Sequence, residues 1–178
     1  MQNNIERVLV DEELIRKRLD TIAKEIETDF PQGPVIVIIL LKGALVFAAD
    51  LLRRIPRELS IECLNVASYH GGVESSGNVD FLDLHFPEVE GAHVLLLDDI
   101  LDTGRTLAAV KKRLLEEGAT AVHTAVLLSK DKTRAEEVEA DYIGFEIGDE
   151  FVVGYGLDYK GKYRNLPYVG VLKLSAAV

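Results

Sequence analysis

Residues 94–107 run Val-Leu-Leu-Leu-Asp-Asp-Ile-Leu-Asp-Thr-Gly-Arg-Thr-Leu: a buried strand, three carboxylates, a hydroxyl-glycine turn and the start of a helix. Free backbone N–H groups, two hydroxyls and the helix dipole at residues 103–106 favour a bound phosphate. Gly104 lets the backbone approach such a ligand closely. Asp98 and Asp99 would repel a phosphate, so they suit a sugar diol or a metal ion. The segment therefore predicts a binding site that combines a phosphate with one of these groups.

The acidic pair sets a condition on the backbone. On an ideal strand Asp98 and Asp99 face opposite sides of the sheet, so both reach one ribose only if the chain leaves the strand there. The alternative interpretation is a strand end with solvated aspartates and a helix cap at Asp102 or Thr103. An isolated Asp-Thr-Gly favours that alternative. The complete array of strand, acidic pair, third aspartate, Thr-Gly-x-Thr turn and helix favours a functional site.

Strand and helix patterns alternate around this segment. Apolar runs predict strands over residues 35–41, 59–67, 93–97, 121–128 and 141–145. Helical spacing predicts helices over residues 11–30, 44–54 and 106–117, the first capped by Asp11. The tail 169–174 also alternates like a strand, without an assigned place in the sheet. This order is typical of an α/β fold with a mainly parallel sheet, in which ligands bind beyond the carboxyl ends of the strands.

Composition excludes several classes of protein. The 178 residues are 48% apolar, which supports one domain, residues 1–178, with its own core. A net charge of −10 argues against a nucleic-acid partner, and a single cysteine, Cys63, cannot form an internal disulfide. The first twenty residues lack a signal-peptide segment, and the longest apolar run, residues 35–41, is too short to span a bilayer. We therefore expect a cytoplasmic protein without a membrane partner.

Residues 98–106 resemble the signature of the type I phosphoribosyltransferases, which bind 5-phosphoribosyl 1-pyrophosphate (PRPP). The resemblance implies that Asp98 and Asp99 hold the ribose hydroxyls and take part in the metal site, and that Asp102 is the general base. It assigns the 5-phosphate to a loop of four residues, Thr103, Gly104, Arg105 and Thr106. Asp98 stands where many members have glutamate, and Arg105 where many have lysine. Neither change affects the reaction class that the resemblance implies.

From about Leu9 to its end, the chain is similar to one branch of that family, the hypoxanthine-guanine phosphoribosyltransferases. Leu41-Lys42-Gly43 matches the family's pyrophosphate loop, whose leucine–lysine peptide bond the family holds cis. Arg164 matches an arginine that contacts pyrophosphate. Ser68 and Tyr69 match the mobile loop, which closes the site against water.

The base site follows from the same resemblance. Lys130 matches the lysine that donates to the purine 6-oxo group, and Phe151 matches the ring that stacks on the base. Val152 contacts the base edge through its backbone, and Asp158, also in the base pocket, binds Mg²⁺. The implied fold is a mainly parallel twisted sheet flanked by helices, with a small base-binding hood built from the terminal segments.

The resemblance implies an enzyme of purine salvage. It transfers the phosphoribosyl group of PRPP to a 6-oxopurine, hypoxanthine or guanine, and releases pyrophosphate with IMP or GMP as product. The family uses Mg²⁺ and works as homodimers or homotetramers. Three alternatives stay open: a xanthine-guanine or other-base phosphoribosyltransferase, a PRPP-sensing regulator that binds nucleic acid, and an interaction domain without a ligand. The presence of Asp102 and the acidic charge favour the enzyme over the regulator.

Overall fold

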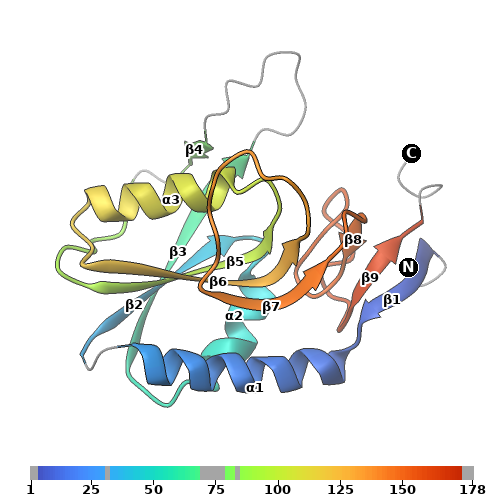
Figure 1. Ribbon diagram of the computed structural model, residues 1–178, viewed down its shortest axis with the longest axis horizontal. Coiled ribbons are helices and arrows are strands. Elements are labelled where there is room, and N and C mark those ends of the chain that lie inside the picture. Colours follow the sequence, from blue (N-terminus) through green and yellow to red (C-terminus); the bar gives the residue numbers. More distant parts are fainter. Residues whose placement is uncertain (1–3, 31–32, 69–78, 83–84, 174–178) are drawn as a thin grey trace.

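The main sheet has six strands in the order β4-β3-β2-β5-β6-β7 (Figure 1). This computed structural model describes residues 4–30, 33–68, 79–82 and 85–173. Five strands run parallel: β2 (Val35–Leu41), β3 (Leu59–Ser68), β5 (His93–Leu101), β6 (Ala121–Lys130) and β7 (Tyr142–Ile147). The sixth, β4 (Val79–Phe81), pairs antiparallel with β3 at the edge. The predicted α/β class with a mainly parallel sheet is confirmed.

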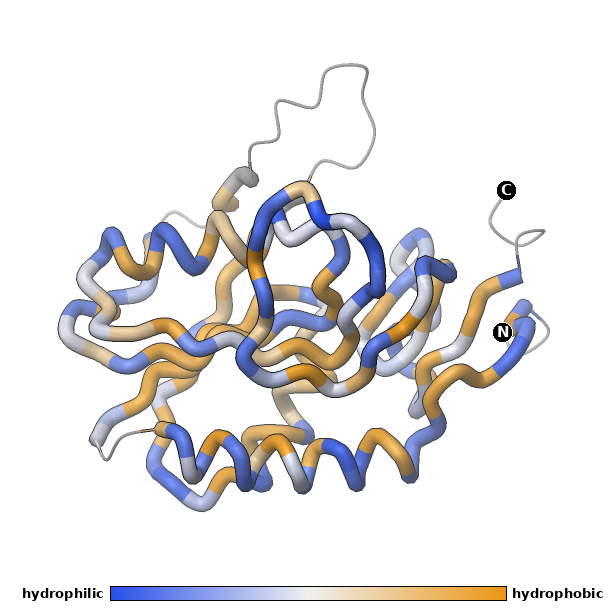
Figure 2. The backbone as a smooth tube through the Cα atoms, viewed as in Figure 1, coloured by the Kyte–Doolittle hydropathy of each residue, from blue (hydrophilic) through white to orange (hydrophobic). Residues whose placement is uncertain are grey.

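Helices cover both faces of this sheet (Figure 1). On one face lie α1 (Glu12–Asp29) and α2 (Leu45–Leu52), and on the other lies α3 (Arg105–Glu116). The side chain of Asp11 accepts a hydrogen bond from the Leu14 N–H at 2.9 Å and caps α1, as predicted. Figure 2 shows hydrophobic and hydrophilic residues alternating along α1, because only one side of the helix packs on the sheet.

The predicted strands and helices are all present, and the strand over residues 35–41 has the predicted bounds, but other elements end at different residues. The strand predicted over 93–97 continues to Leu101, and the one over 121–128 continues to Lys130. Both extensions carry polar residues, and they pair with each other up to Leu101 and Ser129. Backbone pairing with a neighbour, not the run of apolar side chains, decides where a strand ends. For the same reason, the short strand β4 was missed inside the polar region 68–80.

A second, smaller sheet joins the two ends of the chain. Its order is β1-β9-β8, formed by β1 (Ile5–Val10), β9 (Val169–Leu172) and β8 (Val152–Val153), all antiparallel. The alternating tail therefore belongs to this sheet and not to the main one. Strand β1 was not predicted, because its only continuous apolar run is three residues long, Val8–Val10, and all its residues but Val10 are exposed or partly exposed. This sheet is the hood of terminal segments that the sequence led us to expect.

The order of the parallel strands identifies where a ligand would bind. The chain passes from β2 to β3 on one side, and from β5 through β6 to β7 on the other. Strands β2 and β5 are neighbours, so the direction of winding reverses between them. Parallel sheets bind ligands at the carboxyl ends of the strands that flank such a reversal.

Among the described residues, no helix is both long and apolar enough to cross a membrane.

Candidate active site

A pocket of about 230 Å³ opens at the carboxyl ends of β2 and β5. Four groups of predicted site residues line it: Leu41 and Gly43, Asp98 and Asp99, residues 102–104 with Thr106, and Asp158 with Arg164. Its apolar wall was not predicted, since apolar side chains at strand ends carry no chemical signal in the sequence; it consists of Leu40, Val66, Ile100, Leu101 and Leu107. Segments more than one hundred residues apart along the chain therefore share one cavity.

The acidic pair enters the pocket because β5 loses one neighbour. Pairing with β2 ends at Leu97, whereas pairing with β6 continues from Asp98 to Leu101. The expectation that the chain leaves the strand at residue 98 is therefore wrong. The strand continues, but β2 no longer covers one of its edges. Both Asp98 and Asp99 line the space that opens there.

Two glycines bring the loop after β2 against the acidic pair and the hood. The Leu41–Lys42 peptide bond is cis, as the resemblance implies. A Cβ atom on Gly43 would lie 1.7 Å from Oδ2 of Asp99. A Cβ atom on Gly156 would lie 2.1 Å from the carbonyl oxygen of Gly43. The two glycines therefore allow this loop to contact both the Asp99 carboxyl and the turn at Gly156.

Desolvation makes the charged forms of Asp98 and Asp99 less favourable. Burial, followed by the charge of Asp99, raises the pKa of the Asp98 carboxyl well above its usual value. Burial also raises the pKa of Asp99, although its hydrogen bonds and the charge of Arg164 act in the opposite direction. The backbone N–H of Asp99 donates to Oδ1 of Asp98 at 2.9 Å. Both side chains are only partly buried and line the pocket, so they can accept hydrogen bonds from ligand hydroxyls or bind a cation.

Substituting Asp98 with asparagine is expected to stabilise the ligand-free protein at neutral pH. A carboxyl whose pKa rises on folding stabilises the fold while protonated, and this contribution is lost as the pH rises through the folded-state pKa. The amide does not ionise, so we expect the free energy of unfolding to increase by roughly 1–3 kcal/mol. Each kcal/mol should raise the melting temperature by about 2–4 °C. Circular-dichroism melts should converge for the two proteins in acid. A variant that melts below the wild type at neutral pH contradicts the prediction.

Arg164 links Asp158 to the turn at Gly156 beside the pocket. Its Nη2 atom lies 2.6 Å from Oδ1 of Asp158, and its Nη1 donates to the carbonyl of Gly156 at 2.6 Å. Oδ2 of Asp158 accepts from the Gly161 N–H at 2.7 Å. Arg164 and Asp158 are both about one-third exposed in their side chains, so a ligand in the pocket can reach them.

The turn before α3 presents backbone groups without a side-chain cap. Gly104 is the N-cap with φ of 81°, and no side chain caps this end, so the alternative cap at Asp102 or Thr103 is wrong. The first N–H groups of α3 are therefore available to an anion. The N–H groups of Ala135 and Glu136 donate to the Thr103 carbonyl at 3.0 and 3.3 Å and hold the outside of the turn. Arg105 is exposed and lies outside the lining of the pocket.

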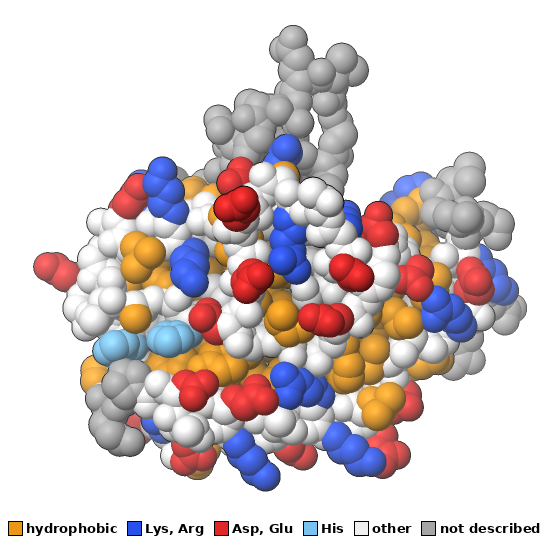
Figure 3. Space-filling view, in the orientation of Figure 1, with side chains coloured by type: hydrophobic (Ala, Val, Ile, Leu, Met, Phe, Trp, Pro, Cys, Tyr) orange, Lys and Arg blue, Asp and Glu red, His pale blue; other side chains and the backbone are white. Residues whose placement is uncertain are grey.

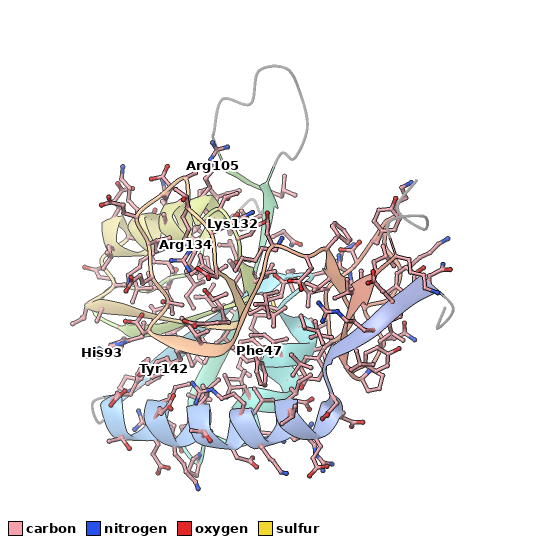
Figure 4. The ribbon with its side chains drawn as sticks, turned by 45° about the vertical axis from the view of Figure 1, so that its right-hand side comes forward. Phe47, His93, Arg105, Lys132, Arg134 and Tyr142 are labelled. Atoms are coloured by element: carbon pink, nitrogen blue, oxygen red, sulfur yellow. The ribbon has the colours of Figure 1, made fainter. Side chains whose placement is uncertain are left out.

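A chain of alternating charges connects the pocket to Lys130. Nζ of Lys130 and Nζ of Lys132 lie 3.0 and 3.1 Å from the same oxygen, Oδ1 of Asp149, and Lys132 also forms an ion pair with Asp102. Lys132 lies on the loop after β6, below Arg105 in the view of Figure 4. Sequence reasoning missed Lys132 and Asp149, because a charged turn normally indicates a solvated surface. The only available signal was the spacing of Lys132 two residues after Lys130.

The remaining predicted residues lie outside the pocket lining. Phe151 is 47% exposed and meets Tyr159 edge to face, with ring centroids 5.7 Å apart, while Val152 is buried in β8. Lys42 is exposed at the start of the loop after β2. Ser68 is the last residue of β3, and Tyr69 lies outside the described residues. The predicted residues thus form the pocket at β2 and β5 and, beside it, the ion-paired lysine group.

Comparisons with known proteins agree with this architecture. The profile of the phosphoribosyl transferase domain matches residues 8–160. The chain is 42% identical over 173 residues to the hypoxanthine-guanine phosphoribosyltransferase of Staphylococcus epidermidis, covering 97% of each. A solved hypoxanthine phosphoribosyltransferase from Staphylococcus aureus superposes with a TM-score of 0.94 at 39% identity, covering 100% of this chain and 97% of that one. The hypoxanthine-guanine phosphoribosyltransferase hpt-2 of Bacillus anthracis gives 0.88 at 37% identity, covering 94% and 99%.

Proposed function

The chain belongs to the phosphoribosyl transferase domain family, and we propose that its active site is the pocket at the carboxyl ends of β2 and β5. The protein is a purine-salvage enzyme that transfers the phosphoribosyl group of PRPP to hypoxanthine or guanine, with release of pyrophosphate. One observation carries the assignment of the site: the four groups of residues that the resemblance assigns to PRPP and Mg²⁺ all contribute to the lining of one cavity. We expect residues 1–178 to form a single phosphoribosyltransferase domain.

Each part of PRPP has a complementary group in the pocket. Asp98 and Asp99 accept hydrogen bonds from the ribose hydroxyls, and the backbone of residues 103–106 binds the 5-phosphate at the start of α3. The loop Leu41–Gly43 and Arg164 bind the pyrophosphate, whose charge must be stabilised as it leaves. Holding both ends of PRPP keeps the ribose carbon in place for attack by the purine.

Asp102 has the position of a general base for the purine. As a ring nitrogen attacks the ribose carbon, the carboxylate takes or holds the imidazole N–H proton of the base. Lys130 donates to the 6-oxo group, Phe151 stacks on the ring and the backbone of Val152 contacts its edge. The support for these roles is the ion-pair chain that connects Lys130 to Asp102, and the exposed face of Phe151.

The donor set also fits Mg²⁺. Magnesium takes one or two protein carboxylates and fills its other positions with water and substrate phosphates. Asp158 supplies a partly exposed carboxylate at the pocket, and Asp98 and Asp99 supply a partly buried acidic pair. When bound, Mg²⁺ neutralises charge on the leaving pyrophosphate.

The test is the conversion of hypoxanthine, guanine, xanthine and adenine by the purified protein with PRPP and Mg²⁺, followed by base absorbance. Hypoxanthine and guanine should react. Adenine places an amino donor against the Lys130 donor, so its kcat/KM should fall by roughly 100-fold, the equivalent of about 3 kcal/mol for unpaired donors. The xanthine reaction decides between the hypoxanthine-guanine and xanthine-guanine subclasses. If no base reacts while PRPP still binds, the PRPP-sensing regulator replaces the enzyme.

The described surface gives little support to that regulator. Figure 3 shows acidic and basic side chains interspersed on the face in view, which is unlike the continuous basic stripe that binds phosphate backbones. The net charge of −10 acts in the same direction.

The location and assembly of the enzyme stay predictions. We expect a cytoplasmic homodimer or homotetramer, as the resemblance implies. Leu45 and Ile61, each about half exposed on α2 and β3, supply apolar surface for such an interface. Light scattering coupled to size exclusion measures the number of subunits.

A further inference from the structure

We propose that Lys132 is a positioning residue for the transfer reaction, because it joins the Asp102 carboxylate to Lys130 through Asp149. This inference rests on the proposed function, in which Asp102 is the general base and Lys130 contacts the 6-oxo group. The sequence resemblance assigned no role to Lys132 or to Asp149.

The contacts form a continuous series of opposite charges. Lys130 and Lys132 meet the same Asp149 oxygen at 3.0 and 3.1 Å, and the Lys132 ammonium also contacts Oδ1 of Asp102. The side chains of Lys130 and Lys132 are only 11% and 27% exposed, whereas Asp149 is 64% exposed. Lys132 is the middle link between two carboxylates, Asp102 at the pocket and the more exposed Asp149.

The fold places these groups at three adjacent strand ends. Asp102 directly follows β5, Lys130 ends β6 with Lys132 two residues later, and Asp149 follows β7. Since β5, β6 and β7 are neighbours in that order, Lys132 comes from the central strand and reaches a carboxylate on each side. A side chain in this position can set the separation between the groups on both sides.

That separation matters for the chemistry of a 6-oxopurine. The 6-oxo oxygen and the nearby imidazole nitrogen lie on one edge of the base, so one ligand edge must meet Lys130 and Asp102 together. Proton transfer needs the carboxylate within hydrogen-bond reach of the nitrogen, and a small misplacement costs up to about 100-fold in rate. Lys132 holds the Asp102 carboxylate at the distance from Lys130 that the edge of the base requires.

Lys132 also supplies a countercharge that the pocket needs. Asp102 shares the cavity with Asp98 and Asp99, and Lys132 is the cation that pairs with it. Hydrogen bonding to Asp102 is the largest cause that raises the pKa of Lys132, so the ammonium stays charged across the neutral range. Removal of the cation leaves Asp102 without its ion-pair partner beside the acidic pair.

The experiment compares Lys132→Gln, Lys132→Arg and Lys112→Gln in steady-state assays that vary hypoxanthine and PRPP separately. Lys132→Gln should lower kcat and raise the KM for hypoxanthine, with kcat/KM reduced by roughly 10- to 100-fold, and leave the KM for PRPP unchanged. Lys132→Arg should recover most of this loss, because a guanidinium can also bridge two carboxylates. Lys112 forms an exposed ion pair with Glu116 on α3, away from the pocket lining, so Lys112→Gln is the matched control and should behave as the wild type.

Other outcomes overturn the inference. It is wrong if Lys132→Gln keeps the wild-type kcat/KM for hypoxanthine. A purely structural role would show three results together. Lys132→Gln would worsen kcat/KM for hypoxanthine and the KM for PRPP alike, it would melt at a lower temperature, and Lys132→Arg would recover nothing. That combination also contradicts the inference. Asp149→Asn should impair hypoxanthine use in the same direction, and unchanged kinetics there contradict the link through Asp149. A wild type inactive on every purine refutes the proposed function itself, whereas an active wild type with an unaffected Lys132→Gln refutes only this inference.

Discussion

Substitution of Asp102 with asparagine is expected to lower kcat for hypoxanthine by roughly 100- to 10,000-fold, the usual contribution of a general base. The amide keeps the shape of the side chain but cannot accept the imidazole proton. Asp102 lines the same pocket as the residues assigned to PRPP, yet it precedes the phosphate turn and contacts Lys132. PRPP binding depends on the other groups, so calorimetry should give an affinity close to that of the wild type.

Asp20→Asn is the matched control for this substitution. Asp20 is also ion-paired, with Nε of Arg54 at 2.8 Å, but it lies on α1 and is largely exposed. Its loss should leave kcat unchanged because Asp20 lies outside the pocket lining, and should cost little stability because exposed ion pairs contribute little. Wild-type turnover in Asp102→Asn removes Asp102 from the mechanism, and a parallel loss of PRPP affinity assigns it to binding instead.

Substitution of Gly156 with alanine is expected to destabilise the protein by about 3 kcal/mol or more and to remove most of the activity. Gly156 has φ of 102°, and its added Cβ would lie 2.1 Å from the Gly43 carbonyl oxygen. The atom in the way belongs to the backbone, so the turn at Gly156 that follows β8, here called the hood turn, must separate from the pyrophosphate loop Leu41–Gly43. Arg164, which donates to the Gly156 carbonyl, would move with the turn. Thermal melts and the KM for PRPP measure the two effects.

Gly91→Ala separates backbone conformation from close approach. Gly91 also has a positive φ of 70°, but a Cβ there meets nothing within 4 Å. It should therefore show only the cost of a left-handed residue, about 1–2 kcal/mol, and retain full activity. Equal melting temperatures and equal activities for the two variants contradict the proposed contact between the hood turn and the pyrophosphate loop.

Local patterns predicted most of the fold. The apolar run Val35–Leu41 indicated a strand buried on both faces, and Asp11 indicated the start of α1, because burial and capping depend on residues close together in the chain. They failed at the edges of the elements. Strand β5 continues through Asp98 and Asp99 because β6 still pairs with it, which no property of those two residues indicates.

The candidate site divides in the same way. The sequence by itself indicated the family, through its resemblance to known members, and it predicted a phosphate turn and an acidic pair, since a phosphate, a diol and a metal each require particular side chains at short spacing. Only the tertiary structure decided that β9 pairs with β1 to form the hood, that Asp99 packs on Gly43, and that Lys132 bridges Asp102 and Asp149. These contacts join residues far apart in the chain, and a charged or small residue does not specify its partner until folding brings the two together.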